Sequence, residues 1–188
     1  MRVGTKSLLI GVHQLLWHPI TVYLAWCRLY GRPTLREVIC IFIHDWGYWG
    51  SADMDGEWGI NHPMLGAKIA GRLFGDDYYD FVLLHSRNLA MKRGAMPSKL
   101  CWADKASILF EPQWFYLFRA QASGELAEYR QKAARWVALN EPDRQWFRWL
   151  KRRLTKAAMD GERRRNQKNA PDRRIRYNNR VSQNAIHS

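Results

Sequence analysis

The sequence has few of the features that mark a secreted or membrane-spanning protein. It contains only three Cys, at positions 27, 40 and 101, and they lack the spacing of a disulfide framework or a zinc finger. The apolar stretch from Ser7 to Tyr30 is interrupted by His, Gln, Pro and Arg, and no small-residue cleavage site follows a compact apolar run. We therefore expect a cytoplasmic protein without a membrane-spanning segment. A peripheral membrane role for the amphipathic start is the minor alternative.

Acidic residues are also scarce, with 17 Asp and Glu against 30 Lys and Arg, for a net charge of +13. The excess is unevenly placed, because residues 151–188 hold twelve Lys and Arg and three Asp and Glu. The folded part is thus only mildly basic. From Gly161 onward apolar residues almost disappear, which predicts a domain over residues 1–160 and a basic, flexible tail over 161–188. Such a tail is able to contact nucleic acid without reading its sequence, or to act only as a solvated extension.

The apolar residues, 47% of the chain, follow a helical rather than an alternating period, and no repeat is present. We therefore predict an all-α fold, a compact helical bundle. The expected helices cover 8–29, 34–44, 61–74, 76–85, 98–110, 113–122 and the stretch after Pro142. Thr34 and Glu37 form a capping-box pattern, Asn61 is the expected N-cap of its helix, and a Gly-rich loop is expected over 47–59.

Several His and Asp residues stand in or beside apolar helical segments, where a polar group is costly unless it is paired or binds a metal. They are His18, His44, Asp45, His62, His85 and Asp104. Imidazoles and carboxylates from several helices of a bundle are a usual ligand set for one or two transition-metal ions. The plainer alternatives are a helix-end cap at His44 and Asp45, and core histidines at the other positions. His13 competes with His18 for the ligand role, but we expect it to be structural.

The order of these residues resembles the HD-domain superfamily of metal-dependent phosphohydrolases, in its two-metal branch. The segments that carry the resemblance are His18–Val22, Ile41–Gly47, His62–Ala67 and Ala103–Lys105, within residues 8 to 115. The resemblance implies that His18, His44, Asp45 and Asp104 hold one ion. It also implies that His62 and His85 hold a second, with Asp45 bridging the two.

Two positions depart from the family pattern. Tyr48 stands where many of these hydrolases carry a phosphate-contacting Lys, and Ser86 stands where some two-metal members carry a further His. Tyr48 is nevertheless expected in the substrate site, because of its place after the His-Asp pair. The resemblance also extends to di-iron oxygenases, which share this ligand order.

Phosphate binding needs nearby cations, and Arg87, Lys92 and Lys105 follow the expected ligands closely in the chain. We expect Arg87 and Lys105 to act in catalysis with Asp45 and Asp104, and each cation has the alternative of being an ordinary surface charge. The acidic loop 53–57 is expected to supply a general acid or to form a turn, and Trp46, Trp49 and Trp58 to wall a pocket or pack in the core.

Together these patterns predict hydrolysis of a phosphate ester or phosphoanhydride, most readily of a nucleotide or dinucleotide, by metal-activated water. The cofactor is expected to be one or two ions of Mn, Fe, Co, Ni, Zn or Mg. A di-iron oxygenase on the same ligands and a nucleic-acid-binding protein acting through the tail are the alternatives. The oligomeric state is left open.

Overall fold

The computed structural model describes residues 1–136 and 140–169, and over these residues it is all-helical without a strand. This confirms the predicted fold class. The α-helices are α1 Val3–Ile10, α2 Trp17–Tyr30, α3 Leu35–Ile43, α4 Pro63–Phe74, α5 Asp76–Leu83, α6 Arg87–Lys92, α7 Lys99–Ala106, α8 Gln113–Ser123, α9 Glu125–Ala133 and α10 Asp143–Asn169. Three 3-10 helices, η1 Trp46–Tyr48, η2 Gly59–Asn61 and η3 Ser107–Phe110, connect them. None of the helices in these ranges combines the length and the apolar character that crossing a bilayer requires.

The N-terminal segment forms two helices, so the prediction of one helix over 8–29 is wrong. The backbone N–H groups of Leu16 and Trp17 donate to Oε1 of Gln14, at 3.0 and 2.6 Å, and this side chain caps a new helix start. Gly11 ends α1 where the chain passes close to Glu125, whose Oε2 would lie 2.2 Å from a Cβ at this position. The break gives α2 its own N-terminus, and His18 lies in its first turn.

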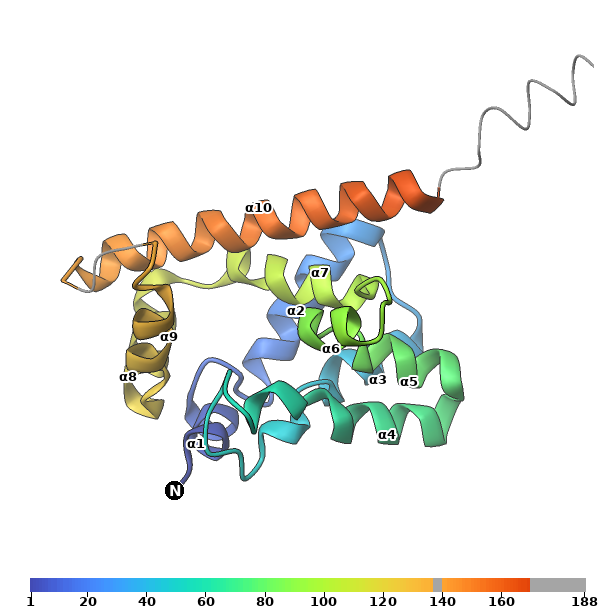
Figure 1. Ribbon diagram of the computed structural model, residues 1–188, viewed down its shortest axis with the longest axis horizontal. Coiled ribbons are helices and arrows are strands. Elements are labelled where there is room, and N and C mark those ends of the chain that lie inside the picture. The colour runs from blue at the N-terminus through green and yellow to red at the C-terminus, as the bar shows by residue number, and fades with distance from the viewer. Residues whose placement is uncertain (137–139, 170–188) are drawn as a thin grey trace, which may run out of the picture.

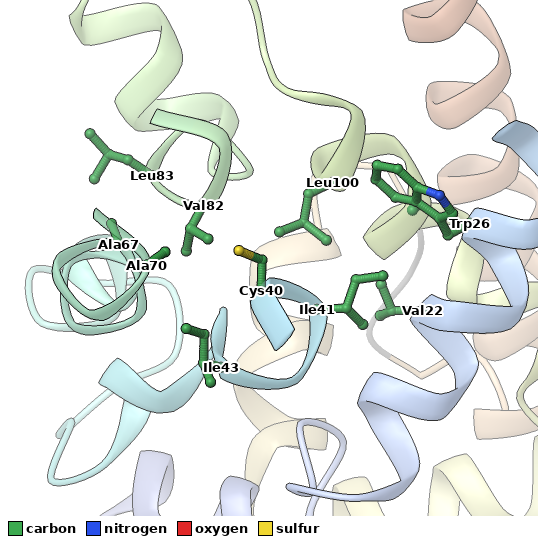
Figure 2. Close-up of a cluster of buried hydrophobic side chains, with 11 residues drawn as sticks. Val22, Trp26, Cys40, Ile41, Ile43, Ala67, Ala70, Val82, Leu83 and Leu100 are labelled. Atoms are coloured by element: carbon green, nitrogen blue, oxygen red, sulfur yellow. The ribbon is translucent and has the colours of Figure 1, made fainter. Parts of the chain in front are cut away.

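The main core lies between α2, α3, α4, α5 and α7 (Figure 2). Its buried members are Val22, Trp26, Cys40, Ile41, Ile43, Ala67, Ala70, Val82, Leu83, Leu100 and Ala103. The capping box at Thr34 and Glu37 forms as predicted and starts α3. Packing of these faces places the C-terminal end of α3 beside α4 and α5.

Two glycines set how closely α4 approaches the end of α3. A Cβ at Gly66 would lie 2.4 Å from the carbonyl oxygen of Ile43, and a Cβ at Gly47 would lie 2.0 Å from that of His62. Only glycine fits contacts this short. They bring the His44–Asp45 end of α3 to the start of α4. There η2 runs directly into the helix, so His62 occupies the N-cap position instead of the expected Asn61.

A second core joins η3, α8, α9 and α10, with Trp146 and Phe147 fully buried among Ile108, Tyr116 and Ala120. Figure 1 shows α10 as a long helix lying across one side of the molecule, with α8 and α9 near its start and α7 beneath its later part. The two cores are thus joined by α10.

Helix α10 runs past the predicted domain boundary at 160/161 and continues to Asn169, and Gly161 and Glu162 contact the bundle. Gly161 is buried against the Trp102 ring, and the Tyr30 hydroxyl donates to Oε2 of Glu162 at 2.7 Å. The first part of the expected flexible tail is therefore packed helix. Residues 170–188, with the rest of that tail, lie outside the described residues.

Candidate metal centre

The six residues proposed as ligands come from five separate segments and converge on one carboxylate. His18 lies in the first turn of α2, His44 and Asp45 end α3, His62 begins α4, His85 follows α5, and Asp104 lies in α7. These positions are mostly helix ends, where the packing of short helices brings side chains of distant segments together. Sequence reasoning therefore selected the six residues that the fold places in one cluster.

Asp45 stands at the centre of the cluster, with each carboxylate oxygen facing two imidazoles. Its Oδ2 lies 3.2 Å from Nε2 of His18 and 3.2 Å from Nε2 of His44. Its Oδ1 lies 3.4 Å from Nε2 of both His62 and His85. The two oxygens thus divide the histidines into two pairs, which is the arrangement that a carboxylate bridging two ions requires.

Asp104 joins the first pair, with its Oδ1 3.3 Å from Nε2 of His18. One half of the cluster therefore offers two imidazoles and two carboxylates, and the other offers two imidazoles and the second oxygen of Asp45. Potential ligand atoms of His18, His44 and Asp104 lie within 4.8 Å of one another, as do those of His44, Asp45 and His85. Both groups are compact enough to hold an ion.

Three of the histidines have their ring orientation set by the backbone. Nδ1 of His44, His62 and His85 each donates to the carbonyl oxygen three residues earlier in the chain, at 2.6 Å in every case. This leaves Nε2 with its lone pair directed into the cluster, as in metal-binding histidines whose other nitrogen is held by a hydrogen bond. The same local turn is thus used at three separate helix ends.

Several polar atoms of the cluster have no hydrogen-bond partner in the described structure. They include Nε2 of His18 and of His44 and Oδ2 of Asp45, all of them buried. In addition, Nε2 of His62 and Nε2 of His85 lie 3.0 Å apart, although both rings already carry a proton on Nδ1. Nε2 of His18 and of His44 lie at ion-pair distance from Oδ2 of Asp45 but form no hydrogen bond with it, and buried polar atoms without a hydrogen bond are rare and costly. A cation between these atoms satisfies them, so the residues present fit one or two metal ions.

The carboxylates also shape the electrostatics of the cluster. Burial lowers the pKa of His18, but its contacts with Asp104 and Asp45 outweigh burial and raise the pKa to about 10. Burial raises the pKa of Asp45, but its interactions with His44 and His18 outweigh burial and hold that pKa well below the ordinary range. Burial also raises the pKa of Asp104, but its contacts with His18 and Lys105 outweigh burial and lower that pKa too. Burial lowers the pKa of His62 to about 3. At neutral pH these pKa shifts give ionised carboxylates, a protonated His18 and a neutral imidazole at His62.

A cavity of about 400 Å³ opens on the cluster. Among the residues proposed for substrate binding, Arg87, Lys105 and Tyr48 line it, and Nζ of Lys105 lies 3.8 Å from Oδ2 of Asp104. Lys92 is exposed near the end of α6 and is not among the lining residues. The Tyr48 ring is buried and stacks on the His62 ring, with centroids 4.1 Å apart and planes 9° from parallel.

The acidic loop divides its roles between two aspartates. Asp53 forms a turn, because its Oδ1 accepts the backbone N–H groups of Gly56 and Gly59 at 2.8 and 2.7 Å. Asp55 lines the cavity and forms an ion pair with Lys132 at 3.1 Å. The three tryptophans Trp46, Trp49 and Trp58 are exposed and line neither the cavity nor the core, contrary to both expectations.

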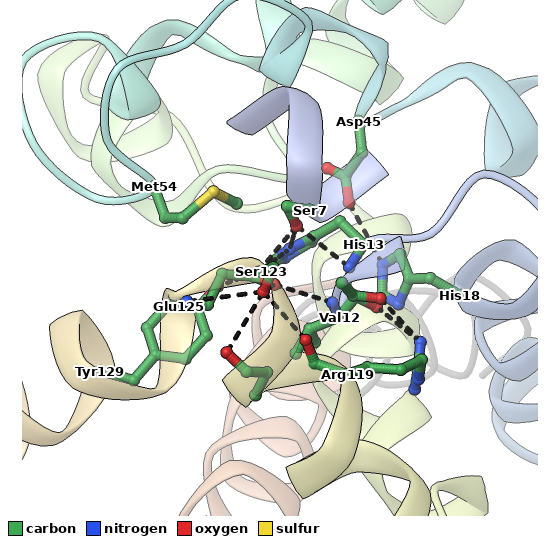
Figure 3. Close-up of polar contacts among 12 residues, drawn as sticks. Ser7, Val12, His13, His18, Asp45, Met54, Arg119, Ser123, Glu125 and Tyr129 are labelled. Atoms are coloured by element: carbon green, nitrogen blue, oxygen red, sulfur yellow. Dashed lines mark hydrogen bonds and ion pairs between the residues drawn. The ribbon is translucent and has the colours of Figure 1, made fainter. Parts of the chain in front are cut away.

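Behind the cluster lies a buried polar network that sequence reasoning missed, centred on Glu125 (Figure 3). The Glu125 carboxylate is fully buried and accepts from Ser7 Oγ at 2.7 Å, Ser123 Oγ at 2.5 Å and the Val12 N–H at 2.9 Å. It also pairs with Nδ1 of His13 at 3.1 Å. No local pattern marks Glu125, since its partners lie mostly more than a hundred positions away.

His13 links this network to the His and Asp cluster. Its ring packs edge-on against the His18 ring, with centroids 5.2 Å apart, and against the Tyr48 ring at 4.8 Å. Burial lowers the pKa of His13, but the Glu125 hydrogen bond outweighs it and raises the pKa. Since Nδ1 of His13 is held by Glu125 and Ser7, the residue supports the cluster from behind.

No family model matches the chain, and neither do the curated proteins or the solved structures with which it was compared. The structure itself therefore defines the class that can be stated: an all-helical protein with His and Asp groups able to hold metal ions.

Proposed function

We propose that the protein is a metal-dependent phosphohydrolase of the HD-domain type. The observation that carries this proposal is the position of Asp45, whose two oxygens each face a pair of imidazole nitrogens. Together with the chain order of the six residues, this supports a dinuclear centre. His18, His44, Asp45 and Asp104 would hold one ion, and His62, His85 and Asp45 the other.

Ions bound there would supply a water of lowered pKa and a Lewis acid for a phosphoryl oxygen. The chain itself would bind and orient the substrate. Arg87 follows the proposed ligand His85 by two residues and lines the cavity without an ion pair among the described residues. Its guanidinium suits two oxygens of one phosphate group, and Lys105, largely buried beside Asp104, adds a second cation.

The donor set also bears on the identity of the metal. Four imidazoles and two carboxylates suit Mn, Fe, Co, Ni or Zn, whereas Mg prefers oxygen ligands. We therefore propose a transition-metal enzyme and place Mg last among the candidates.

The proposal is tested by elemental analysis and phosphate release on the purified full chain. We expect two ions per chain, and phosphate release from at least one member of a nucleotide and dinucleotide panel. Asp45→Asn should lose both ions and at least about a hundredfold in rate, because the bridging ligand is removed. Asp77→Asn, on the exposed face of α5, is the matched control and should retain both.

Absence of phosphate release with Mn, Fe, Co, Ni, Zn or Mg would overturn the hydrolase proposal. Substrate-dependent oxygen consumption by iron-loaded protein would instead favour the di-iron oxygenase, which uses the same ligands. Activity under strict anaerobiosis with Zn or Mn would exclude the oxygenase.

A further inference from the structure

The cavity has a second wall, built by the end of α9, the turn that follows it and α10, which carry none of the proposed ligands. Lys132, Trp136, Trp149 and Arg153 lie in this wall. Much of the remaining lining is apolar or aromatic, with Val12, Ile108, Tyr116, Tyr129, Leu150 and Leu154. Glu111 also lines the cavity and is paired with Arg119 at 2.6 Å. A cavity of about 400 Å³ is within the usual size of small-molecule sites and much larger than one phosphate group needs.

Arg153 is held in this wall by aromatic rings rather than by acids. Its guanidinium carbon lies 3.9 Å from the Trp136 ring centroid and 5.4 Å from that of Trp149. Stacking of a guanidinium on an aromatic face orients it and leaves its N–H groups free at the edge. Arg153 has no ion pair or hydrogen bond with any described residue.

The other cations of the cavity differ in this respect. Lys132 is paired with Asp55 at 3.1 Å, and Lys105 lies 3.8 Å from Asp104. Only Arg87 and Arg153 lack an acidic partner among the described residues that line the cavity. Arg87 follows the proposed ligand His85 by two residues, whereas Arg153 belongs to α10, which carries no proposed ligand.

We propose that Arg153 binds a second phosphate group of the substrate, separated by an organic body from the phosphate held at the metal centre and Arg87. The substrate is thus a compound with two separate phosphates rather than a simple monoester. This inference rests on the proposed function, which supplies the first phosphate position. Orientation by Trp136 and Trp149 lowers the entropy lost when the guanidinium binds its anion.

The test is calorimetric binding of two probes to the Mn-loaded full chain at constant ionic strength: adenosine 5′-monophosphate and adenosine 3′,5′-bisphosphate. We expect the wild type to bind the bisphosphate roughly tenfold more tightly, as one added charge-assisted interaction provides. Arg153→Ala and Arg153→Gln should remove this preference and leave binding of the monophosphate within about twofold. Arg152→Ala removes the same charge from the neighbouring position of α10, which does not line the cavity, and should keep the preference.

Equal binding of both probes by the wild type would overturn the inference and leave the proposed function standing. An equal loss in Arg152→Ala and Arg153→Ala would also overturn it, because the effect would then come from the general charge of α10. If neither probe binds, the phosphate position at the metal centre fails together with the inference. Metal content and circular dichroism of each variant show that it is folded, and the two substitutions at Arg153 check each other.

Discussion

Asp45 is the residue on which the proposed chemistry depends. Its surroundings explain why its two carboxylate oxygens face different pairs of imidazoles. It follows the last turn of α3, where the backbone is held by the close contacts at Gly47 and Gly66. Because the carboxylate is buried, any rotation would break contacts with two imidazoles at once. Residues that support the histidines should therefore influence the two halves of the centre separately.

Tyr48 is such a residue, since its ring stacks on His62 in the second half of the centre. Tyr48→Leu should weaken binding of the second ion by roughly tenfold, the usual effect of losing an outer support of a ligand, and leave the first ion within about twofold. Tyr48→Phe keeps the ring and should retain both affinities. Stepwise metal titration measures both constants.

Trp49→Leu removes a neighbouring aromatic ring that is exposed and should have no effect. If Tyr48→Phe loses the second ion as fully as Tyr48→Leu, the hydroxyl and not the stacked ring would be the supporting group.

Glu125 is a single residue that contributes to the stability of the fold. Glu125→Gln puts an amide where the buried carboxylate accepts several donors, and should lower the free energy of unfolding by about 3 kcal/mol, measured by urea denaturation. Burial raises the pKa of Glu125, but the hydrogen bond and charge of His13 outweigh it and hold the pKa below the ordinary 4.5. The stabilisation is thus present above pH 4.5 and is lost as the pH falls through the lowered pKa.

The difference between wild type and Glu125→Gln should consequently shrink as the pH falls below 4.5 and through the lowered pKa of Glu125. Glu57→Gln, in the exposed loop, is the control and should match the wild type at every pH. A difference that stays constant down to the pH of acid unfolding would contradict the assignment of Glu125 as an ionised acceptor.

At the scale of elements, α10 is the helix whose role differs most from expectation. Its sequence after Asp160 is polar and basic, which is typical of a solvated tail. In the structure its inner face packs on α7 at Gly161, and the Tyr30–Glu162 hydrogen bond ties it to α2. The helix therefore closes one wall of the cavity and also covers the back of the helix that carries Asp104.

Gly161→Ala tests this packing, because packed and exposed positions predict opposite signs for the change in the free energy of unfolding. In an exposed helix the substitution stabilises by about 1 kcal/mol, because Ala has the higher helix propensity. Here the added Cβ would lie 2.4 Å from two atoms of the Trp102 ring, so we expect destabilisation by about 2 kcal/mol in urea denaturation. Gln167→Ala, on the exposed face of α10, should be neutral or slightly stabilising. Stabilisation by Gly161→Ala would show that α10 is not packed there.

At the scale of the whole molecule, the proposed ligands join five segments that otherwise meet through short helices. Ions that bind only the folded chain stabilise it by about 2.7 kcal/mol at a hundred times their Kd. A chelator should therefore lower the thermal midpoint of the wild type, and restoring Mn should raise it again. Asp45→Asn is expected to bind no ions, so its thermal midpoint should be low and should be the same with and without the chelator. A wild-type thermal midpoint that changes with neither the chelator nor added Mn would contradict a metal centre of this kind.

The helical period and the caps made most elements predictable, because these signals are local. Thr34 with Glu37 starts a helix as expected, Asp76 begins another, and Gly124 separates α8 from α9. The break between α1 and α2 was missed for two reasons. Gln14 caps the helix through a long side chain, and a glycine is needed at position 11 because Glu125, far away in the chain, packs against it. The packing of α10 beyond Asp160 was missed for a similar reason, because only the folded chain brings Gly161 against Trp102.

The sequence by itself determined that the chain is helical, and it marked six His and Asp residues by their polar character on apolar helices. Only the tertiary structure decided that one carboxylate faces four imidazoles, that Tyr48 stacks on His62, and that Arg153 and Arg87 line a common cavity. The physical reason is the distance along the chain over which each interaction acts. Helix propensity and capping act over a few residues, whereas the distances within the centre depend on how several helices pack around close-contact glycines.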